Sequence, residues 1–155
     1  MFASVGAPSY PSLAFSPLHV GGNHWTLIVL DFKNLRAAYY DSMYRQGVTE
    51  TQARSMFSKI LKFTEILGIR ATTWTTHVLR RDFTPQQVDG YSCGVFVLQV
   101  CHYILEHAAT YTLNRNPTLT PKVDVYPRDC CPAVYRGMME RSIRTRRIDL
   151  SIPVD

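Results

Sequence analysis

Cys93 stands where a polar, turn-prone loop runs into a long apolar segment, in the stretch PQQVDGYSCGVFVLQVCHYIL from Pro85 to Leu105. Free cysteine often behaves as a small buried hydrophobe, so packing alone could explain this position. A thiol at the N-terminus of a helix, however, loses its proton easily and becomes a nucleophile. Which explanation holds depends on whether the chain also supplies a base for that thiol.

A nucleophilic thiol needs a base to take its proton, and the base needs an acceptor that orients it. His24 begins a segment of strand-forming residues, and Asp41 ends the next such segment. If the two segments pair as a hairpin, both residues lie at its open end. We predict that Asp41 accepts the Nδ1–H of His24, which leaves Nε2 facing Cys93.

Thiol catalysis also needs donors for the developing oxyanion, and two are at hand. The backbone N–H of Cys93 is one, and the side-chain amide of Gln87 on the preceding loop is the other. Taken singly, these residues have ordinary interpretations: a strand-end histidine, a turn-forming aspartate, a solvated glutamine, a packed thiol and, at Trp25, a core tryptophan. Their combination favours nucleophilic catalysis.

The surrounding segments predict the elements that must position these residues. Residues 24–32 and 35–42 are rich in strand formers and are joined by a short turn, so they predict a hairpin. Residues 72–80 return to strand composition. Residues 1–17 predict an irregular N-terminal segment, because serines and prolines interrupt them.

Three helices are expected. Residues 49–68 predict an amphipathic helix, because mostly apolar residues recur at helical spacing and give one face that can be buried. This face contains Ala53, Met56, Phe57, Ile60, Leu61, Thr64 and Leu67. A capping box of Thr49 and Gln52 begins this helix and Gly68 ends it. Residues 94–109 are apolar nearly all round and predict a central helix, and residues 132–146 predict a last one after a loop over 110–122.

This order of elements predicts an α+β fold, in which a small mixed sheet packs against a central helix that starts at the nucleophile. The length of 155 residues suits one domain with a real core. The formal net charge of +5 favours acidic partners but is too small to indicate nucleic acid by itself. The C-terminal segment RGMMERSIRTRR is basic, and such a run is more typical of a solvated helix face than of a nucleic-acid site. Its arginines are Arg136, Arg141, Arg144, Arg146 and Arg147.

The four cysteines are Cys93, Cys101, Cys130 and Cys131, and none forms a C-x-x-C pair. A disulfide framework and a zinc site are therefore both disfavoured, and we expect no metal or cofactor. Cysteines without a disulfide framework also indicate a reducing compartment. Neither a signal peptide nor a membrane span is apparent, so we expect an intracellular protein with no membrane partner.

Three blocks of the sequence resemble the ubiquitin-like-protease family of cysteine peptidases, the SUMO or sentrin-specific proteases. They are PLHVGGNHWTLIVLDF, AAYYDSM and PQQVDGYSCGVFVLQVCHYI. The family pattern is a His-Trp pair on a strand, an Asp at the end of the next strand, and a Q-x5-C-G element whose Cys opens the central helix. The resemblance implies that His24 is the general base, Asp41 its orienting group, Cys93 the nucleophile and Gln87 an oxyanion donor. It also implies that Trp25 covers a narrow tunnel for the Gly-Gly tail of the modifier.

Two positions depart from that pattern. The family usually has an acidic residue directly before the nucleophile, where this chain has Ser92, and often Asn where this chain has Asp89. Family members also usually carry an N-terminal region before the His-Trp pair. The resemblance therefore implies that residues 18–155 are the catalytic portion of such a domain, with its N-terminal part missing.

The resemblance implies a thiol protease or isopeptidase of the nucleus or cytoplasm that cleaves after the C-terminal Gly-Gly of a ubiquitin-like modifier. It would either release the modifier from its lysine-linked conjugates or process the modifier's precursor. The basic charge favours an acidic-faced partner such as SUMO over ubiquitin. Two alternatives stay open: a catalytically impaired module that binds the modifier, and a protease for ubiquitin or another ubiquitin-like modifier. Nucleic-acid binding through the terminal arginines is a third, weaker hypothesis.

Overall fold

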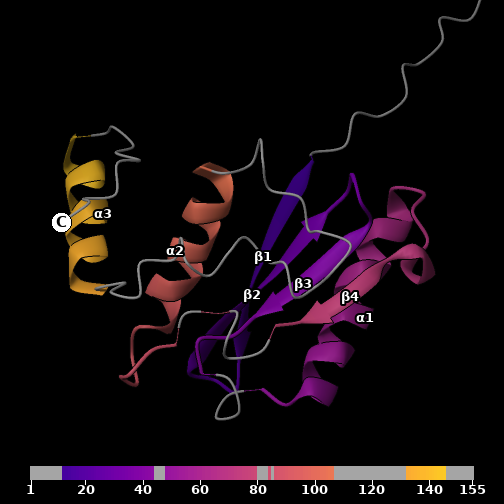
Figure 1. The fold of residues 1–155 in the computed structure, drawn as a ribbon, viewed down its shortest axis with the longest axis horizontal. Helices are drawn as coiled ribbons and strands as arrows, with labels where there is room; N and C mark the ends of the chain where they lie inside the picture. The colour runs from indigo at the N-terminus through magenta and orange to yellow at the C-terminus, as the bar shows by residue number, and fades with distance from the viewer. Residues whose placement is uncertain (1–11, 44–47, 80–83, 85, 107–131, 146–155) are drawn as a thin grey trace, which may run out of the picture.

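The computed structural model of the chain describes residues 12–43, 48–79, 84, 86–106 and 132–145 (Figure 1). Its strands are β1 (Leu13–Val20), β2 (His24–Asp31), β3 (Arg36–Tyr40) and β4 (Thr75–Val78). Its helices are α1 (Glu50–Ile66), the short 3-10 helix η1 (Ala71–Thr73), α2 (Cys93–Glu106) and α3 (Pro132–Thr145). Among these described residues, no helix is both long enough and apolar enough to cross a membrane.

The four strands form one mixed sheet in the order β1-β2-β3-β4. The first three run antiparallel, whereas β4 runs parallel to β3. A parallel pair needs a crossover connection, and α1 supplies it between β3 and β4. The chain therefore leaves β3 and β4 at the same end of the sheet, which brings the segments after these two strands together.

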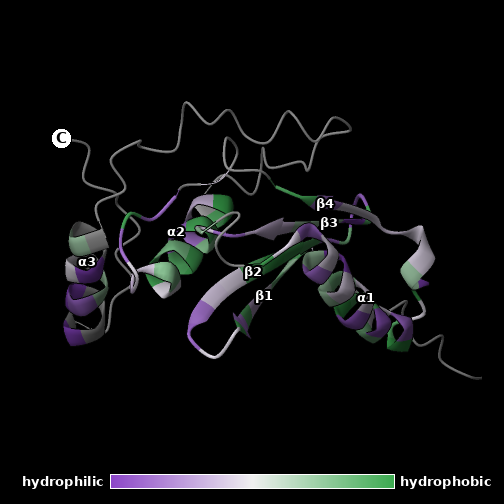
Figure 2. Cartoon of the chain, turned by 90° about the horizontal axis from the view of Figure 1, so that it is seen from below, coloured by the Kyte–Doolittle hydropathy of each residue, from purple (hydrophilic) through white to green (hydrophobic). Residues whose placement is uncertain are grey.

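The sheet is covered on both faces by helices, which Figure 2 shows from below. Alternate residues of β2 face opposite ways: Leu27 and Val29 join one apolar cluster with α2, while Ile28 and Leu30 join another with α1. A strand that is buried on both faces reads as an almost unbroken apolar run, which explains the sequence HWTLIVLD. The predicted mixed sheet against a central helix is confirmed.

Most predicted elements lie where the sequence put them. The hairpin of β2 and β3 forms, and Asp31 holds its turn by accepting from the backbone N–H and the side chain of Asn34. The capping box of Thr49 and Gln52 begins α1. Gly68 follows that helix with a φ of 78°, a value that glycine adopts without strain. Leu67 is exposed, so its assignment to the buried face of this helix is wrong.

The prediction of an irregular segment over residues 1–17 is wrong for residues 13–17, which form the first part of β1. Residues 1–11 lie outside the described part of the chain. Leu13 and Phe15 pack on the α2 side of the sheet, and Ala14 packs on the α1 side, as alternation requires. Pro17 is tolerated because β1 is an edge strand, where its missing N–H breaks no central ladder.

Helix α2 begins at Cys93 itself and packs against β2. Its buried side chains include Phe96, Val97, Val100 and Ile104. The prediction that it is covered all round is wrong, because Leu98 and Leu105 are exposed, the latter by 56%. The sequence positions of the two leucines, seven apart, place them on one side of the helix.

The last helix is confirmed over Pro132–Thr145 and contacts α2. Several predicted features lie outside the described residues: the loop over 110–122, the adjacent Cys130 and Cys131, and the arginines Arg146 and Arg147.

We expect Thr49→Ala to destabilise the protein by about 1 kcal/mol, because the capping box loses its acceptor for the backbone N–H of Gln52. The measurement is urea unfolding followed by circular dichroism. Thr51→Ala is the matched control, since Thr51 is exposed within the first turn and alanine favours helix. An unfolding midpoint for Thr49→Ala at or above that of Thr51→Ala would contradict the assignment.

Candidate active site

His24 and Asp41 are hydrogen-bonded to each other at the open end of the hairpin. His24 is the first residue of β2, and Asp41 directly follows the last residue of β3. The distance from His24 Nε2 to Asp41 Oδ1 is 2.8 Å, and both side chains are buried. The strand pairing predicted from the sequence thus brings this histidine and this carboxylate together.

The ring nitrogen that meets Asp41 is Nε2, so the prediction that Asp41 accepts from Nδ1 is wrong. Because a carboxylate can only accept, Nε2 is the donor in this contact, and in the neutral ring Nδ1 then holds the free lone pair. Among the described residues, the buried Nδ1 has no hydrogen-bond partner. A buried polar atom without a partner is costly, and at a catalytic site it is the atom expected to accept a proton.

The Asp41 carboxylate is fixed from several sides. Its Oδ1 also accepts from the backbone N–H of Met43 at 2.7 Å, and its Oδ2 accepts from the backbone N–H of Val48 at 3.3 Å. The hydroxyl of Tyr39 donates to Oδ2 at 3.4 Å. Burial raises the pKa of Tyr39 far above its usual value, and the nearby Asp41 charge adds to this effect. A carboxylate held by this many donors cannot swing away from His24.

Cys93 is the first residue of α2 and is buried. The segments 24–25 and 93–94 lie side by side, because a Cβ built on Gly94 would lie 3.7 Å from Cδ1 of Trp25. The thiol therefore opens a helix beside the strand that begins with His24. The N-terminus of a helix favours a negative charge such as a thiolate.

Gln87 is tied to the residue after Asp41. The hydroxyl of Ser42 donates to Gln87 Oε1 at 2.7 Å, and the backbone N–H of Gln87 donates to Ser42 O at 3.0 Å. This fixes which end of the amide carries the nitrogen, and Nε2 donates to Asp89 O at 2.6 Å. The amide has a second N–H, so the role of oxyanion donor stays a prediction.

Trp25 is 42% exposed at the surface beside the site, so its core interpretation is wrong. Its ring packs against His19 on the neighbouring strand, with ring centroids 4.8 Å apart. An exposed tryptophan held by a second ring beside the nucleophile can roof a narrow channel. Its role in covering a substrate tail stays a prediction.

Sequence reasoning missed three groups that position this site: Ser42, Gln86 and Arg136. Gln86 donates its amide to Asp41 O at 3.1 Å, and Arg136 donates to Ser92 Oγ at 3.1 Å. The place of Ser42 directly after Asp41 was the one available sequence signal. Arg136 carried none, because it stands 44 residues from its partner.

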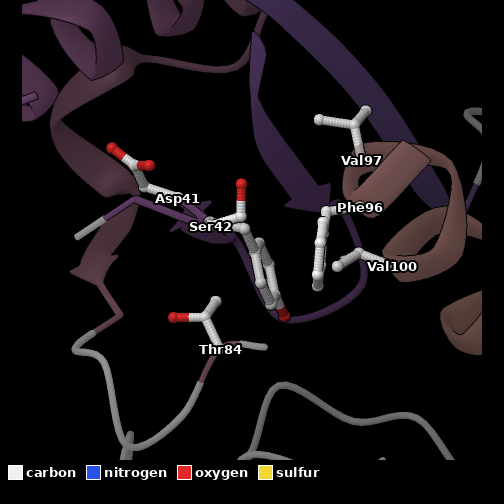
Figure 3. Close-up of a pocket in the computed structure, with 7 residues that line it drawn as sticks. Asp41, Ser42, Thr84, Phe96, Val97 and Val100 are labelled. Atoms are coloured by element: carbon white, nitrogen blue, oxygen red, sulfur yellow. The ribbon is translucent and has the colours of Figure 1, made fainter. Parts of the chain in front are cut away.

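A pocket adjoins the site between the end of β3 and α2 (Figure 3). It is lined by Tyr40, Asp41, Ser42, Thr84, Phe96, Val97 and Val100. The three α2 side chains face Ser42 across it. Among the described residues, no three His, Cys, Asp or Glu side chains gather as metal ligands would.

A thiol that opens a helix, beside an imidazole held by a carboxylate, is the arrangement of a cysteine peptidase. Residues 11–119, more than half of the chain, match the Ulp1 protease family, C-terminal catalytic domain. The protein belongs to this family of cysteine peptidases.

Curated relatives agree with this assignment. The chain is 27% identical over 103 residues to sentrin-specific protease 2 of Homo sapiens, an alignment covering 64% of this chain and 17% of that protein. It is 25% identical over 99 residues to deubiquitinase and deneddylase Dub1 of Chlamydia trachomatis serovar L2b, covering 63% of this chain and 25% of that protein. The chain thus spans a quarter or less of the length of these relatives.

Solved structures share the fold. The C-terminal Ulp1 protease domain, in complex with Smt3, the yeast orthologue of SUMO, is 22% identical with a TM-score of 0.52, covering 69% of this chain and 46% of that chain. ChlaDub1 from Chlamydia trachomatis is 20% identical with a TM-score of 0.52, covering 87% of this chain and 52% of that chain. At these identities the likeness concerns the fold.

We expect Asp41→Asn to slow alkylation of Cys93 by iodoacetamide at pH 7 by about tenfold or more, because the base loses its orienting charge. In this variant, an asparagine NH₂ group in place of Oδ2 would face the backbone N–H of Val48, so that two donors would meet without an acceptor. Asp31→Asn is the matched control, since Asp31 is also buried but lies at the other end of the hairpin. Equal slowing in both variants would contradict the role of Asp41.

We expect Cys93, and not Cys101, to be alkylated at neutral pH. Burial raises the pKa of the Cys101 thiol to about 11, so only about one molecule in ten thousand carries that thiolate at pH 7. Labelling of Cys101 should grow only as the pH approaches 11, since a raised thiol pKa delays thiolate formation. Fragment-ion mass spectrometry separates the two sites. Faster labelling of Cys101 at pH 7 would contradict the assignment of the nucleophile.

Proposed function

We propose that this chain is a thiol isopeptidase that cleaves after the C-terminal Gly-Gly of a ubiquitin-like modifier. The observation that carries the proposal is the buried His24, which donates from Nε2 to Asp41 and whose Nδ1, at the strand end beside α2, has no hydrogen-bond partner among the described residues. In the neutral ring, this orientation gives Nδ1 the lone pair that a general base needs to accept a proton. The thiol of Cys93 opens the adjacent helix.

The proposed reaction uses these groups in order. Nδ1 of His24 takes the proton of Cys93, and the thiolate attacks the carbonyl carbon of the terminal glycine. The backbone N–H of Cys93 and the amide of Gln87 stabilise the oxyanion. The C–N bond then breaks, and His24 returns the proton to the leaving lysine amine. Water hydrolyses the thioester, with His24 accepting its proton, and the free carboxylate and thiol result.

Exclusion supplies the proposed specificity. Trp25 stands beside Gly94 and packs against His19, which supports the proposal that its indole ring covers the approach to Cys93. Two glycines in extended conformation are the thinnest segment a polypeptide offers. A side chain at either position would clash with the ring, and such a clash discriminates without further contacts.

We propose SUMO as the modifier. The formal net charge of +5 favours an acidic partner, and sentrin-specific protease 2 and the Smt3-bound Ulp1 domain are among the similar proteins. Similarity to a deubiquitinase and deneddylase favours ubiquitin or NEDD8 as the second candidate. A reducing compartment, nucleus or cytoplasm, would keep the Cys93 thiol reduced.

The test is a panel of three probes, SUMO, ubiquitin and NEDD8, each carrying a C-terminal electrophile in place of the last carboxylate. We expect an adduct with the SUMO probe that disappears in Cys93→Ala and persists in Cys101→Ala, the control thiol on the same helix. Gel mobility and intact mass measure the adduct.

Other outcomes would change the assignment. An adduct with ubiquitin or NEDD8 alone would replace SUMO but keep the chemistry. No adduct with any probe, together with measurable modifier binding that Cys93→Ser leaves unchanged, would replace the isopeptidase by a binding module. An adduct that survives Cys93→Ala would refute the proposed nucleophile.

A further inference from the structure

A polar cluster lies directly before the nucleophile and joins α3 to the start of α2. The carboxylate of Asp89 accepts from the hydroxyl of Ser92 at 2.6 Å and from its backbone N–H at 2.8 Å. It also accepts from the backbone N–H of Tyr91 at 3.0 Å. These hydrogen bonds, with that of the Ser92 hydroxyl first, lower the pKa of Asp89, so the carboxylate is ionised at neutral pH.

Ser92 connects this carboxylate to a guanidinium. The Ser92 hydroxyl donates to Asp89 and accepts from Arg136 at 3.1 Å, and its side chain is fully buried. The guanidinium also lies over the ring of Tyr91, 5.4 Å from its centroid. Only a group that both donates and accepts can fill the position of Ser92 between these two charges. A carboxylate there would face Asp89 with like charge.

The cluster determines the charge that surrounds Cys93. Ser92 accepts from the backbone N–H of Phe96 and so begins α2, one residue before the thiol. An uncompensated carboxylate at this helix end would oppose a second negative charge on Cys93. Arg136, joined to Asp89 through the Ser92 hydroxyl, offsets part of this negative charge, which favours a thiolate at the helix N-terminus.

We propose that Arg136 is a positioning residue for the nucleophile, which acts through Ser92 and Asp89 to hold the loop before Cys93 and to balance its charge. This inference rests on the proposed function, because it takes Cys93 as the attacking group. Among the described residues, the titratable and charged groups on the segments around Cys93 include His24 with its partner Asp41, His19 against Trp25, and Asp89 with Arg136. Of these, Asp89 lies on the loop before α2 and Arg136 on α3, whereas the others lie on β1, on β2 or directly after β3.

The test is the pH dependence of Cys93 alkylation by iodoacetamide, followed by fragment-ion mass spectrometry. We expect Arg136→Gln to move the midpoint to higher pH by about 0.2 to 0.7 units and to slow alkylation at pH 7 about two- to fivefold. Arg144→Gln is the matched control, because Arg144 lies on the same helix but pairs with the exposed Glu140. It should leave the midpoint unchanged.

Removing the opposing charge should reverse the effect. Asp89→Asn alone should move the midpoint to lower pH, and the double variant with Arg136→Gln should return close to the wild-type midpoint. A merely structural arginine would slow alkylation without moving the midpoint, and Asp89→Asn would not rescue it. Either of these two results would overturn the proposal.

Moving the carboxylate from position 89 to position 92 gives an independent check. Ser92→Asp should raise the midpoint, because two carboxylates then meet where a hydroxyl now donates. Adding Asp89→Asn restores one carboxylate facing Arg136, so the double variant should recover alkylation at pH 7. If the double variant melts at the wild-type temperature but does not recover alkylation of Cys93 at pH 7, the proposed role of the cluster is wrong.

Alkylation needs no modifier, so this inference and the proposed function fail separately. Shifted midpoints without any probe adduct would keep the role of Arg136 and remove the isopeptidase. A SUMO adduct with an unshifted midpoint in Arg136→Gln would keep the isopeptidase and remove the role of Arg136.

Discussion

The hydrogen bond from His24 Nε2 to Asp41 Oδ1 is the interaction on which the site depends. It joins the first residue of β2 to the residue after β3, so it exists only when these strands pair in the observed register. Burial strengthens it, because a hydrogen bond is electrostatically stronger in the low dielectric inside the protein. The sheet core and the candidate chemistry are therefore consequences of the same strand pairing.

Topology brings the remaining groups to the same end of the sheet. Because β4 runs parallel to β3, the chain leaves β4 at the end where Asp41 stands. The loop that follows is anchored there by Gln86 on Asp41 O and by Gln87 on Ser42. This loop then delivers Cys93 to the start of α2, beside the beginning of β2. Three distant parts of the chain converge because one crossover helix, α1, makes the last strand parallel.

The two departures from the family pattern belong to one local arrangement. The Ser92 hydroxyl donates a hydrogen bond to the Asp89 carboxylate, so the two residues that differ from the family pattern contact each other. Arg136 extends the arrangement to α3, which also packs against α2. The C-terminal helix is thus connected to the nucleophile by side chains as well as by packing.

The sequence alone determined the types of the main elements and the candidate residues. Periodicity, capping signals and turn residues are local, and they were sufficient for the hairpin of β2 and β3, for α1 with its capping box, and for α2 and α3. Order along the chain sufficed to pair His24 with Asp41, because antiparallel strands joined by a short turn must bring these ends together.

Tertiary structure decided what depends on orientation and on distant contacts. It turned the imidazole so that Nε2, rather than Nδ1, meets Asp41, and it recruited residues 13–17 as an edge strand although serine and proline argued against one. It also joined Ser42 to Gln87 and Arg136 to Ser92, across 45 and 44 residues. No local pattern encodes such contacts, because they arise only when packed elements fix which side chains face one another.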